Sequence, residues 1–162
     1  MSENGVNMQI ITLESPIHCA GLSLKDSGLP MAFESLGLLW DRFHKEVLPG
    51  LEHQVQPPVE VAVCTASDYL VGSQTAEGRA FSELTEFAIP PGPYLKAEFS
   101  ANDFSQLVDQ VLPNLWPKVE AWAKERGVVF DNGGLCSVEV YPQETVTQPR
   151  PSMYCLYPVK PS

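Results

Sequence analysis

Apolar residues follow two different rhythms along the chain, and each predicts a different element. Short segments in which apolar and polar residues alternate predict β-strands, whereas segments in which apolar residues recur every third or fourth position predict amphipathic helices. We expect the strand at 84–89 to pair with that at 59–65 across a loop. The predicted strands are 8–13, 17–24, 59–65, 84–89, 94–99, 135–141 and 153–159, and the predicted helices are 31–48 and 103–126.

The second helical segment carries end signals and two internal prolines. Ser100 or Asn102 is expected to cap its start, and Gly127 is expected to end it. Pro113 and Pro117 lie within the pattern. Because an interior proline lacks the N–H group and clashes with the preceding turn, we expect the helix to kink or to divide in two.

The order strand–helix–strand–strand occurs twice, and the two copies meet at the Pro-Pro-Gly-Pro run at 90–93. The halves, about 8–89 and 94–160, share little sequence, but Leu39-Trp40 in the first helix matches Leu115-Trp116 in the second. Such a duplication predicts an α+β fold in a single domain: two βαββ repeats related by a pseudo-twofold axis, with a mostly antiparallel sheet and two long helices on one face. A central ligand cleft is expected where the helices meet the sheet along this axis.

The composition is that of a globular protein, and it argues against two classes of partner. The 162 residues fit one domain, and 44% of them are hydrophobic. No apolar run approaches the roughly 20 residues that span a bilayer, and the polar N-terminal segment does not resemble a signal peptide, so we expect a cytoplasmic protein without membrane contact. The formal net charge is −10 with no basic cluster. Direct nucleic-acid binding is therefore not expected; the charge favours cationic partners, although it also serves solubility alone.

The residue types that commonly bind metals or cofactors form no motif. The four cysteines include no CxxC pair, and the three histidines have no HxxxH or HExxH spacing. No phosphate-binding glycine loop or nucleophile motif is present. We therefore predict reduced thiols, no metal site and no cofactor, and we assign no catalytic residue.

A carboxylate within residues 137–141 (SVEVY) is the most informative candidate residue. Strand alternation places Ser137, Glu139 and Tyr141 on one face and the two valines on the other. Burying an unpaired carboxylate is expensive, so a central strand that keeps Glu139 would hold it for a cationic guest. Spacing alone does not decide this, because a solvent-facing Glu on an ordinary strand is the commoner case.

Aromatic residues supply walls for such a site. Trp40 and Trp116 lie at matching points of the two helices, Tyr141 shares the face of the candidate carboxylate, and Tyr154 or Tyr157 follows on the next strand. Aromatic rings attract cations, more strongly where water is excluded. A carboxylate among aromatic walls therefore suits an apolar ammonium or a dye-like cation, although spacing leaves a core role for both tryptophans equally open.

Several segments resemble the gyrase-inhibitor-like effector-binding domains, which also form the ligand-binding part of AraC-type and multidrug-sensing transcription regulators. They are the strand start at 89–94 (IPPGPY), Leu115-Trp116 followed by Trp122 in the second helix, and Val138-Glu139-Val140-Tyr141-Pro142. In the first half, Phe33 and Leu39-Trp40 resemble the corresponding helix. The resemblance covers about residues 8–160.

This resemblance implies that Glu139 lies in the cleft and faces cationic ligands. It also implies that aromatic residues of both helices and of the last strands line the same cleft: Trp40, Trp116, Tyr141, Tyr154 and Phe33. The chain shows no helix-turn-helix region, so it resembles the free-standing members of the family, some of which are carried as integron cassettes. A role in transcription regulation would then need a separate DNA-binding regulator.

These observations leave three functional hypotheses. The first is a stand-alone sensor or sequestering protein for hydrophobic, drug- or dye-like cationic aromatic molecules. The second is an inhibitor protein that binds DNA gyrase. The third is a small hydrolase in which Glu139 and Tyr141 act as general base and acid. Because no nucleophile is proposed, a binding protein is preferred over an enzyme. The oligomeric state, a homodimer included, is left open.

Overall fold

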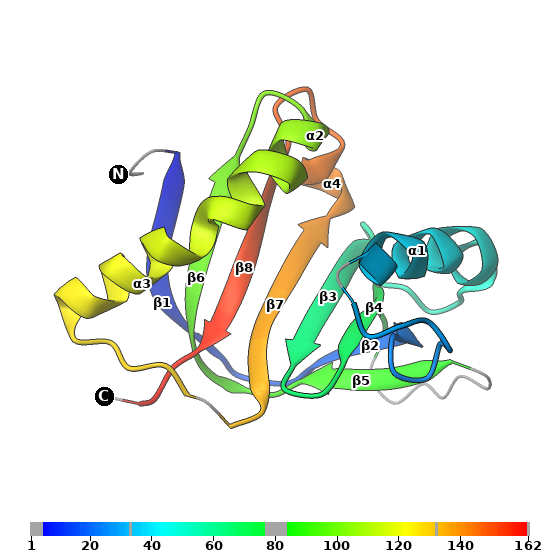
Figure 1. Cartoon of the computed structure of the whole chain (residues 1–162), viewed down its shortest axis with the longest axis horizontal. Helices are drawn as coiled ribbons and strands as arrows, with labels where there is room; N and C mark the ends of the chain where they lie inside the picture. The colour runs from blue at the N-terminus through cyan, green and yellow to red at the C-terminus, as the bar shows by residue number, and fades with distance from the viewer. Residues whose placement is uncertain (1–4, 33, 77–83, 132, 162) are drawn as a thin grey trace.

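Eight antiparallel strands form one sheet in the computed structural model, which describes residues 5–32, 34–76, 84–131 and 133–161 (Figure 1). The strand order is β1-β6-β8-β7-β3-β4-β2-β5. All seven predicted strands are present, with ends within two residues of the prediction, together with an additional strand, β4. The bounds are β1 Val6–Leu13, β2 Ile17–Ser23, β3 Val59–Thr65, β4 Tyr69–Gln74, β5 Thr85–Ile89, β6 Gly92–Ser100, β7 Leu135–Pro142 and β8 Ser152–Pro158.

Both predicted helical segments are helical, but neither is a regular α-helix throughout. The first begins as α1 (Glu34–Arg42) and continues through a π-helical turn at Phe43–Val47 and a 3-10 turn at Leu48–Gly50. The second begins as α2 (Phe104–Gln106) and ends as α3 (Leu115–Arg126). A π-helical turn at Leu107–Val111 and a 3-10 turn at Leu112–Asn114 join these two parts. A short helix, α4 (Gln143–Val146), follows β7.

The prediction for the second helical run is wrong for the residue that caps its start and confirmed for the residue that ends it. Asp103, and neither Ser100 nor Asn102, caps the start: its carboxylate accepts a hydrogen bond of 2.8 Å from the backbone N–H of Gln106. Gly127 ends the run in the left-handed conformation that favours glycine, with φ +68°.

The prolines change the type of turn without ending the second helical run. Pro113 lies within the 3-10 turn. Pro117 is the third residue of α3, where the backbone N–H has no partner within a regular helix. The expected division therefore takes the form of a change in hydrogen-bond pattern between α2 and α3.

The predicted pairing of 84–89 with 59–65 is wrong. β3 pairs with β4 and β7, whereas β5 pairs with β2. The intervening strand β4 lies in the segment predicted as a loop, because Gly72 interrupts its apolar pattern. Gly72 is required by packing: a Cβ atom there would lie 2.4 Å from the carbonyl oxygen of Ala20 on β2.

The sheet order shows how the two halves are joined. From the centre outwards, β7-β8-β6 of the second half matches β3-β4-β2 of the first, and β1 and β5 close the two edges. β1, although it belongs to the first half of the sequence, pairs with β6 of the second half. β1–β2 and β5–β6 run side by side as one ribbon, since Leu13 pairs with Gly92 and Ile17 with Ile89. Figure 1 shows this ribbon turning where these pairs meet.

The two faces of the sheet carry separate hydrophobic clusters. Both helical runs pack on one face, where Leu39, Phe43 and Val119 share a cluster with strand residues. The opposite face holds a smaller cluster that includes Val138 and Val140 of β7. The two valines therefore face away from the helices, as strand alternation predicted. No helix among the described residues combines the length and the apolar character needed to cross a membrane.

Candidate functional site

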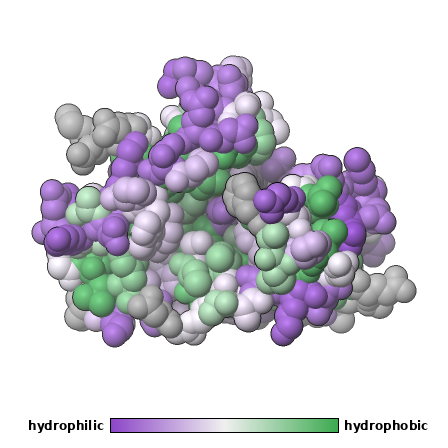
Figure 2. All heavy atoms as spheres, viewed as in Figure 1, coloured by the Kyte–Doolittle hydropathy of each residue, from purple (hydrophilic) through white to green (hydrophobic). Residues whose placement is uncertain are grey.

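A cavity of about 820 Å³ lies between the two helical runs, above the central strands β7 and β8. Figure 2 shows apolar residues gathered in the hollow between the two lobes and hydrophilic residues on the outer surfaces. The first helical run contributes Leu36 and Trp40, and the second contributes Val108, Leu112, Pro113 and Trp116. From the strands and their loops come Ala66, Tyr69, Phe130, Asp131, Gly134, Leu135, Cys136, Ser137, Glu139, Tyr141, Cys155, Tyr157 and Pro158.

Glu139 lies on the floor of this cavity in a hydrogen-bonded pair with Tyr141. The two residues are neighbours on the same face of β7, and the Tyr141 hydroxyl donates to Oε1 of Glu139. Burial raises the pKa of Glu139, and the hydrogen bond from Tyr141 lowers it by a smaller amount. Burial also raises the pKa of Tyr141, and the neighbouring Glu139 charge raises it further. Tyr141 therefore keeps its proton and serves as a donor to the carboxylate.

Two more tyrosines lie within electrostatic range of this carboxyl group. Burial, followed by the charge of Glu139, raises the pKa of Tyr69, and the neighbouring Trp40 side chain lowers it by a smaller amount. Burial raises the pKa of Tyr157, with smaller contributions from Cys155 and from Glu139. The carboxyl group is thus surrounded by neutral hydroxyl groups, and these do not cancel its charge when it is ionised.

Trp40 forms the wall on the side of the first helical run. Its ring meets Tyr141 edge-on, with the centroids 5.6 Å apart and an interplanar angle of 83°. The ring of His44 stacks on it at 5.5 Å. His44 Nε2 lies 2.6 Å from Oε1 of the buried Glu60, which anchors this wall to β3.

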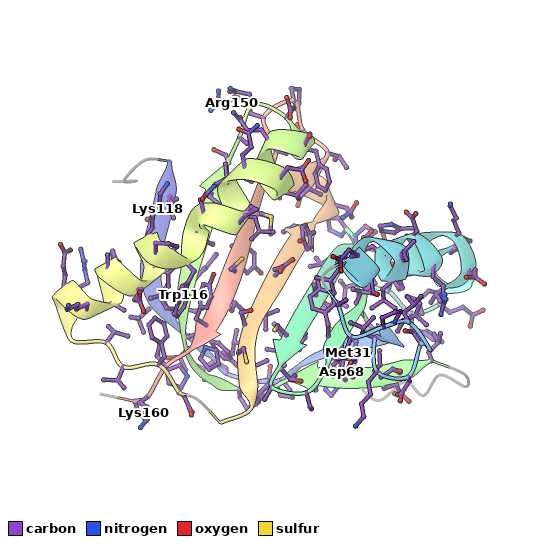
Figure 3. All side chains as sticks on the ribbon, in the orientation of Figure 1. Met31, Asp68, Trp116, Lys118, Arg150 and Lys160 are labelled. Carbon is purple, nitrogen blue, oxygen red and sulfur yellow. The ribbon has the colours of Figure 1, made fainter. Side chains whose placement is uncertain are left out.

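Trp116 forms the opposite wall together with Phe130 and Tyr157. Its ring centroid lies 5.1 Å from that of Phe130 and 5.5 Å from that of Tyr157. Trp116 is 44% exposed, although it is a large apolar residue. Figure 3 shows it beneath the second helical run, next to the central strands. An aromatic surface left open in this way is available to a ligand.

The described residues that line the cavity carry negative charge without positive charge. Glu139 lies on the floor and Asp131 is an exposed lining residue. Among the residues that the structure describes, no lysine, arginine or histidine lines the cavity. The described part of the lining therefore offers no ion-pair partner to Glu139.

The structure brings four of the predicted site residues together and separates one. Glu139, Trp40, Trp116 and Tyr141 line the same cavity. Tyr154 does not: it packs with the cluster on the opposite face, where Nζ of Lys96 lies 4.4 Å from its ring centroid. Phe33 lies outside the described residues.

Strand register explains the error at Tyr154 and identifies residues that the sequence reasoning missed. Glu139 pairs with Cys155, so the cavity-facing residues of β8 are Cys155 and Tyr157. Knowing this pair would have selected Tyr157, which the sequence left as an alternative to Tyr154. Tyr69 was missed because β4 was missed, and Phe130 and Asp131 lie between predicted elements. Among the described residues there is no group of three or more metal-ligating side chains that could hold an ion.

No protein-family model matches the sequence, and no curated protein matches it. Solved structures do match over nearly the whole chain. An integron cassette protein from the mobile metagenome of Vibrio cholerae is 18% identical, with a TM-score of 0.60 and coverage of 96% of each chain. SAV2435, solved bound to tetraphenylphosphonium, is 12% identical, with a TM-score of 0.65 and coverage of 95% of this chain and 94% of its own.

A third match is EcmrR in a complex with DNA. It is 12% identical, with a TM-score of 0.67, and the match covers 98% of this chain but 59% of EcmrR. At these identities the matches concern the fold. They confirm the predicted α+β class and are consistent with the gyrase-inhibitor-like fold that the sequence resemblance implied.

Proposed function

We propose that this protein binds hydrophobic cationic small molecules in the central cavity, as a stand-alone sensor or sequestering domain. One observation carries the proposal: Glu139 lies at the floor of an aromatic cavity whose described lining contains no basic side chain. A buried carboxylate without a cationic partner is unfavourable, as the raised pKa of Glu139 reflects. A ligand cation would supply the missing charge.

The two aromatic walls favour a ligand that is both cationic and apolar. Trp40 with Tyr141 forms one wall, and Trp116 with Phe130 and Tyr157 forms the other. Aromatic rings attract cations by roughly 0.5–2 kcal/mol each, the larger value applying where water is excluded. The tetraphenylphosphonium bound to SAV2435 belongs to this chemical class, which supports the proposal through the shared fold.

Substitution of Glu139 by Gln tests the proposal, with tetraphenylphosphonium as the probe in isothermal titration calorimetry. Glutamine keeps the size and hydrogen bonding of the side chain but removes its charge. We expect the affinity to fall roughly 10- to 100-fold, which corresponds to about 1.4–2.8 kcal/mol. A neutral aromatic compound of similar size should bind both proteins with equal, weak affinity.

Glu98→Gln provides the matched control. Glu98 is exposed on β6 and pairs with Tyr154, so the variant removes the same charge at a distance from the cavity. It should bind tetraphenylphosphonium as the unaltered protein does. Equal affinity of the Glu139→Gln variant would disprove the role proposed for Glu139.

The hydrogen bond between Tyr141 and Glu139 also supports a second candidate, hydrolysis of a reactive small molecule. In that reaction the carboxylate would activate water and the tyrosine would protonate the leaving group. Turnover of an electrophilic substrate that disappears in Glu139→Gln would favour it over binding alone. A gyrase supercoiling assay tests the remaining alternative, and equal inhibition by Glu139→Gln and the unaltered protein would show that gyrase binding does not require the charge of Glu139.

A further inference from the structure

Three of the four cysteines gather around the cavity. Cys136 and Cys155 line it, and Cys64 lies on the strand beside Cys136. Strand alternation puts Cys64 on the same face of β3 as Ala62, which belongs to the cluster beneath the helices. Cys19 belongs to the cluster on the opposite face. The cavity proposed to bind cations is therefore also rich in thiols, and the role of Glu139 does not account for them.

An irregularity in the β3–β7 ladder brings Cys64 and Cys136 together. Cys64 pairs with Ser137 and Thr65 pairs with Leu135, which leaves Cys136 as an extra residue on β7. Such a bulge redirects a side chain. It explains why Cys136 lines the cavity, although strict alternation from Val138 would send it to the opposite face.

The bulge is held on both sides. On one side is the regular ladder that begins at the pair Cys64–Ser137. On the other side, the backbone N–H of Ala66 donates a hydrogen bond of 2.9 Å to the carbonyl oxygen of Gly134. The backbone pairing thus fixes the relative position of the two residues from which the thiol side chains extend.

The two thiols interact and differ in accessibility. They lie on adjacent strands at the bulge, where Cys64 pairs with Ser137, the residue next to Cys136. Burial raises the pKa of Cys64 most, and Cys136 and then Glu139 raise it further. Cys136 is exposed, whereas Cys64 is half-buried. An incoming electrophile therefore meets Cys136 first, with Cys64 placed to react second.

We propose that Cys64 and Cys136 form a two-thiol site for aromatic trivalent arsenicals, with the aryl group of the ligand directed into the cavity. The hydrated arsenical carries an aryl group and two hydroxyl groups on arsenic. Each thiol sulfur forms one bond to arsenic and displaces one hydroxyl group, which leaves as water with the thiol proton. The products are one cyclic dithioarsenite and two waters, and no oxidation state changes.

An aromatic trivalent arsenical matches a site that offers two thiols and aromatic walls but no third metal-ligating side chain among the described residues. Trivalent arsenic forms three bonds, so two thiols and the aryl carbon complete its valences. The described residues contain no group of three or more ligands, which a structural zinc ion would need. The aryl group has aromatic walls to pack against in a cavity of about 820 Å³. The proposal does not require Glu139, so it stands or falls separately from cation binding.

Phenylarsine oxide is the probe, and intact-mass spectrometry of the reduced protein is the measurement. We expect one phenylarsenic group per chain, released by a small dithiol but not by an equal concentration of monothiol. Cys64→Ser and Cys136→Ser should each weaken retention roughly 10²-fold, because the second arsenic–sulfur bond is intramolecular. Cys19→Ser, on the opposite face, is the matched control and should retain the adduct.

The unaltered protein provides a test that does not depend on how the variants fold. In it, the adduct should protect Cys64 and Cys136 together from alkylation, as mapped by peptide mass spectrometry. Protection of Cys155 in place of either residue would overturn the proposal, as would full retention by Cys64→Ser or Cys136→Ser. Tetraphenylphosphonium binding by Cys64→Ser would show that a loss of the arsenical site leaves the cation site intact.

Discussion

At the scale of single residues, the proposed function makes the carboxyl group of Glu139 unfavourable for the free protein and favourable for the complex with a cation. Burial disfavours its ionised form, while the hydroxyl of Tyr141 partly offsets this by donating a hydrogen bond to it. An approaching cation must find the carboxylate deprotonated. Binding is therefore coupled to release of the proton from Glu139, at any pH below its raised pKa.

This coupling predicts that cation affinity depends on pH. The affinity for tetraphenylphosphonium should rise as pH increases through the raised pKa of Glu139 and level off above it. Tyr141→Phe removes the hydrogen bond that lowers this pKa, so its midpoint should move to higher pH. Calorimetric titrations over a series of pH values measure both midpoints.

Tyr154→Phe is the matched control, because it removes the same hydroxyl group on the opposite face of the sheet. Its midpoint should equal that of the unaltered protein. An affinity that does not change with pH, or a midpoint in Tyr141→Phe that moves downward, would contradict the assignment of Glu139 as the titrating group.

At the scale of elements, the contact between β2 and β4 depends on two glycines. Gly21 and Gly72 pair across the strands, and a Cβ atom on Gly21 would lie 1.9 Å from the carbonyl oxygen of Val71. We expect Gly72→Ala to lower the free energy of unfolding by about 1–3 kcal/mol or more, because backbone atoms would have to move apart. Urea denaturation followed by circular dichroism measures the change.

Gly37→Ala is the control for this prediction. Gly37 lies within α1, and a Cβ atom there would have no neighbour within 4 Å. Since alanine favours a helix interior over glycine by roughly 0.5–1 kcal/mol, this variant should be slightly stabilised. If both variants change stability by the same amount, close packing of β2 against β4 is not what selects Gly72.

The same elements show what could be read from the sequence. Period-two alternation found seven strands because each has one face on a hydrophobic cluster, and the helical rhythm found both helical runs. β4 was missed because glycine at a close backbone approach resembles a loop signal. Within the site, the position of Glu139 and Tyr141 followed from alternation along one strand. The choice of Tyr157 over Tyr154 required the register between β7 and β8, which no local pattern contains.

At the scale of the whole molecule, the cavity lies where the two halves meet. β7 and β3 are adjacent at the centre of the sheet, and each helical run covers one side of the cavity. β1, from the first half of the sequence, pairs with β6 of the second half and so links the two halves at that edge of the sheet. Two similar halves can thus share a cavity to which they contribute different residues: the carboxyl group comes from the second half alone.

The cost of holding Glu139 in this cavity should be visible in the stability of the whole fold. The folded-state pKa of Glu139 is raised above its ordinary value of 4.5, so the folded protein binds this proton more tightly than the unfolded chain does. The corresponding stability is fully present below the ordinary pKa and is lost as pH rises through the folded pKa, at roughly 1.4 kcal/mol for each unit of difference. The Glu139→Gln variant has no titrating group at this position, so its stability does not fall in this way as pH rises. Its Tm should therefore exceed that of the unaltered protein at neutral pH and equal it at acidic pH, as measured by scanning calorimetry.

Adding tetraphenylphosphonium should reverse the order of the Tm values of the unaltered protein and Glu139→Gln. Tetraphenylphosphonium binds the folded state and raises the Tm of the unaltered protein by mass action, whereas Glu139→Gln should respond only weakly. The variant would then be the more stable protein without ligand and the less stable one with it. A Glu139→Gln variant that is less stable at neutral pH without ligand would mean that the carboxylate already has a stabilising partner, and the argument for a ligand cation would lose its basis.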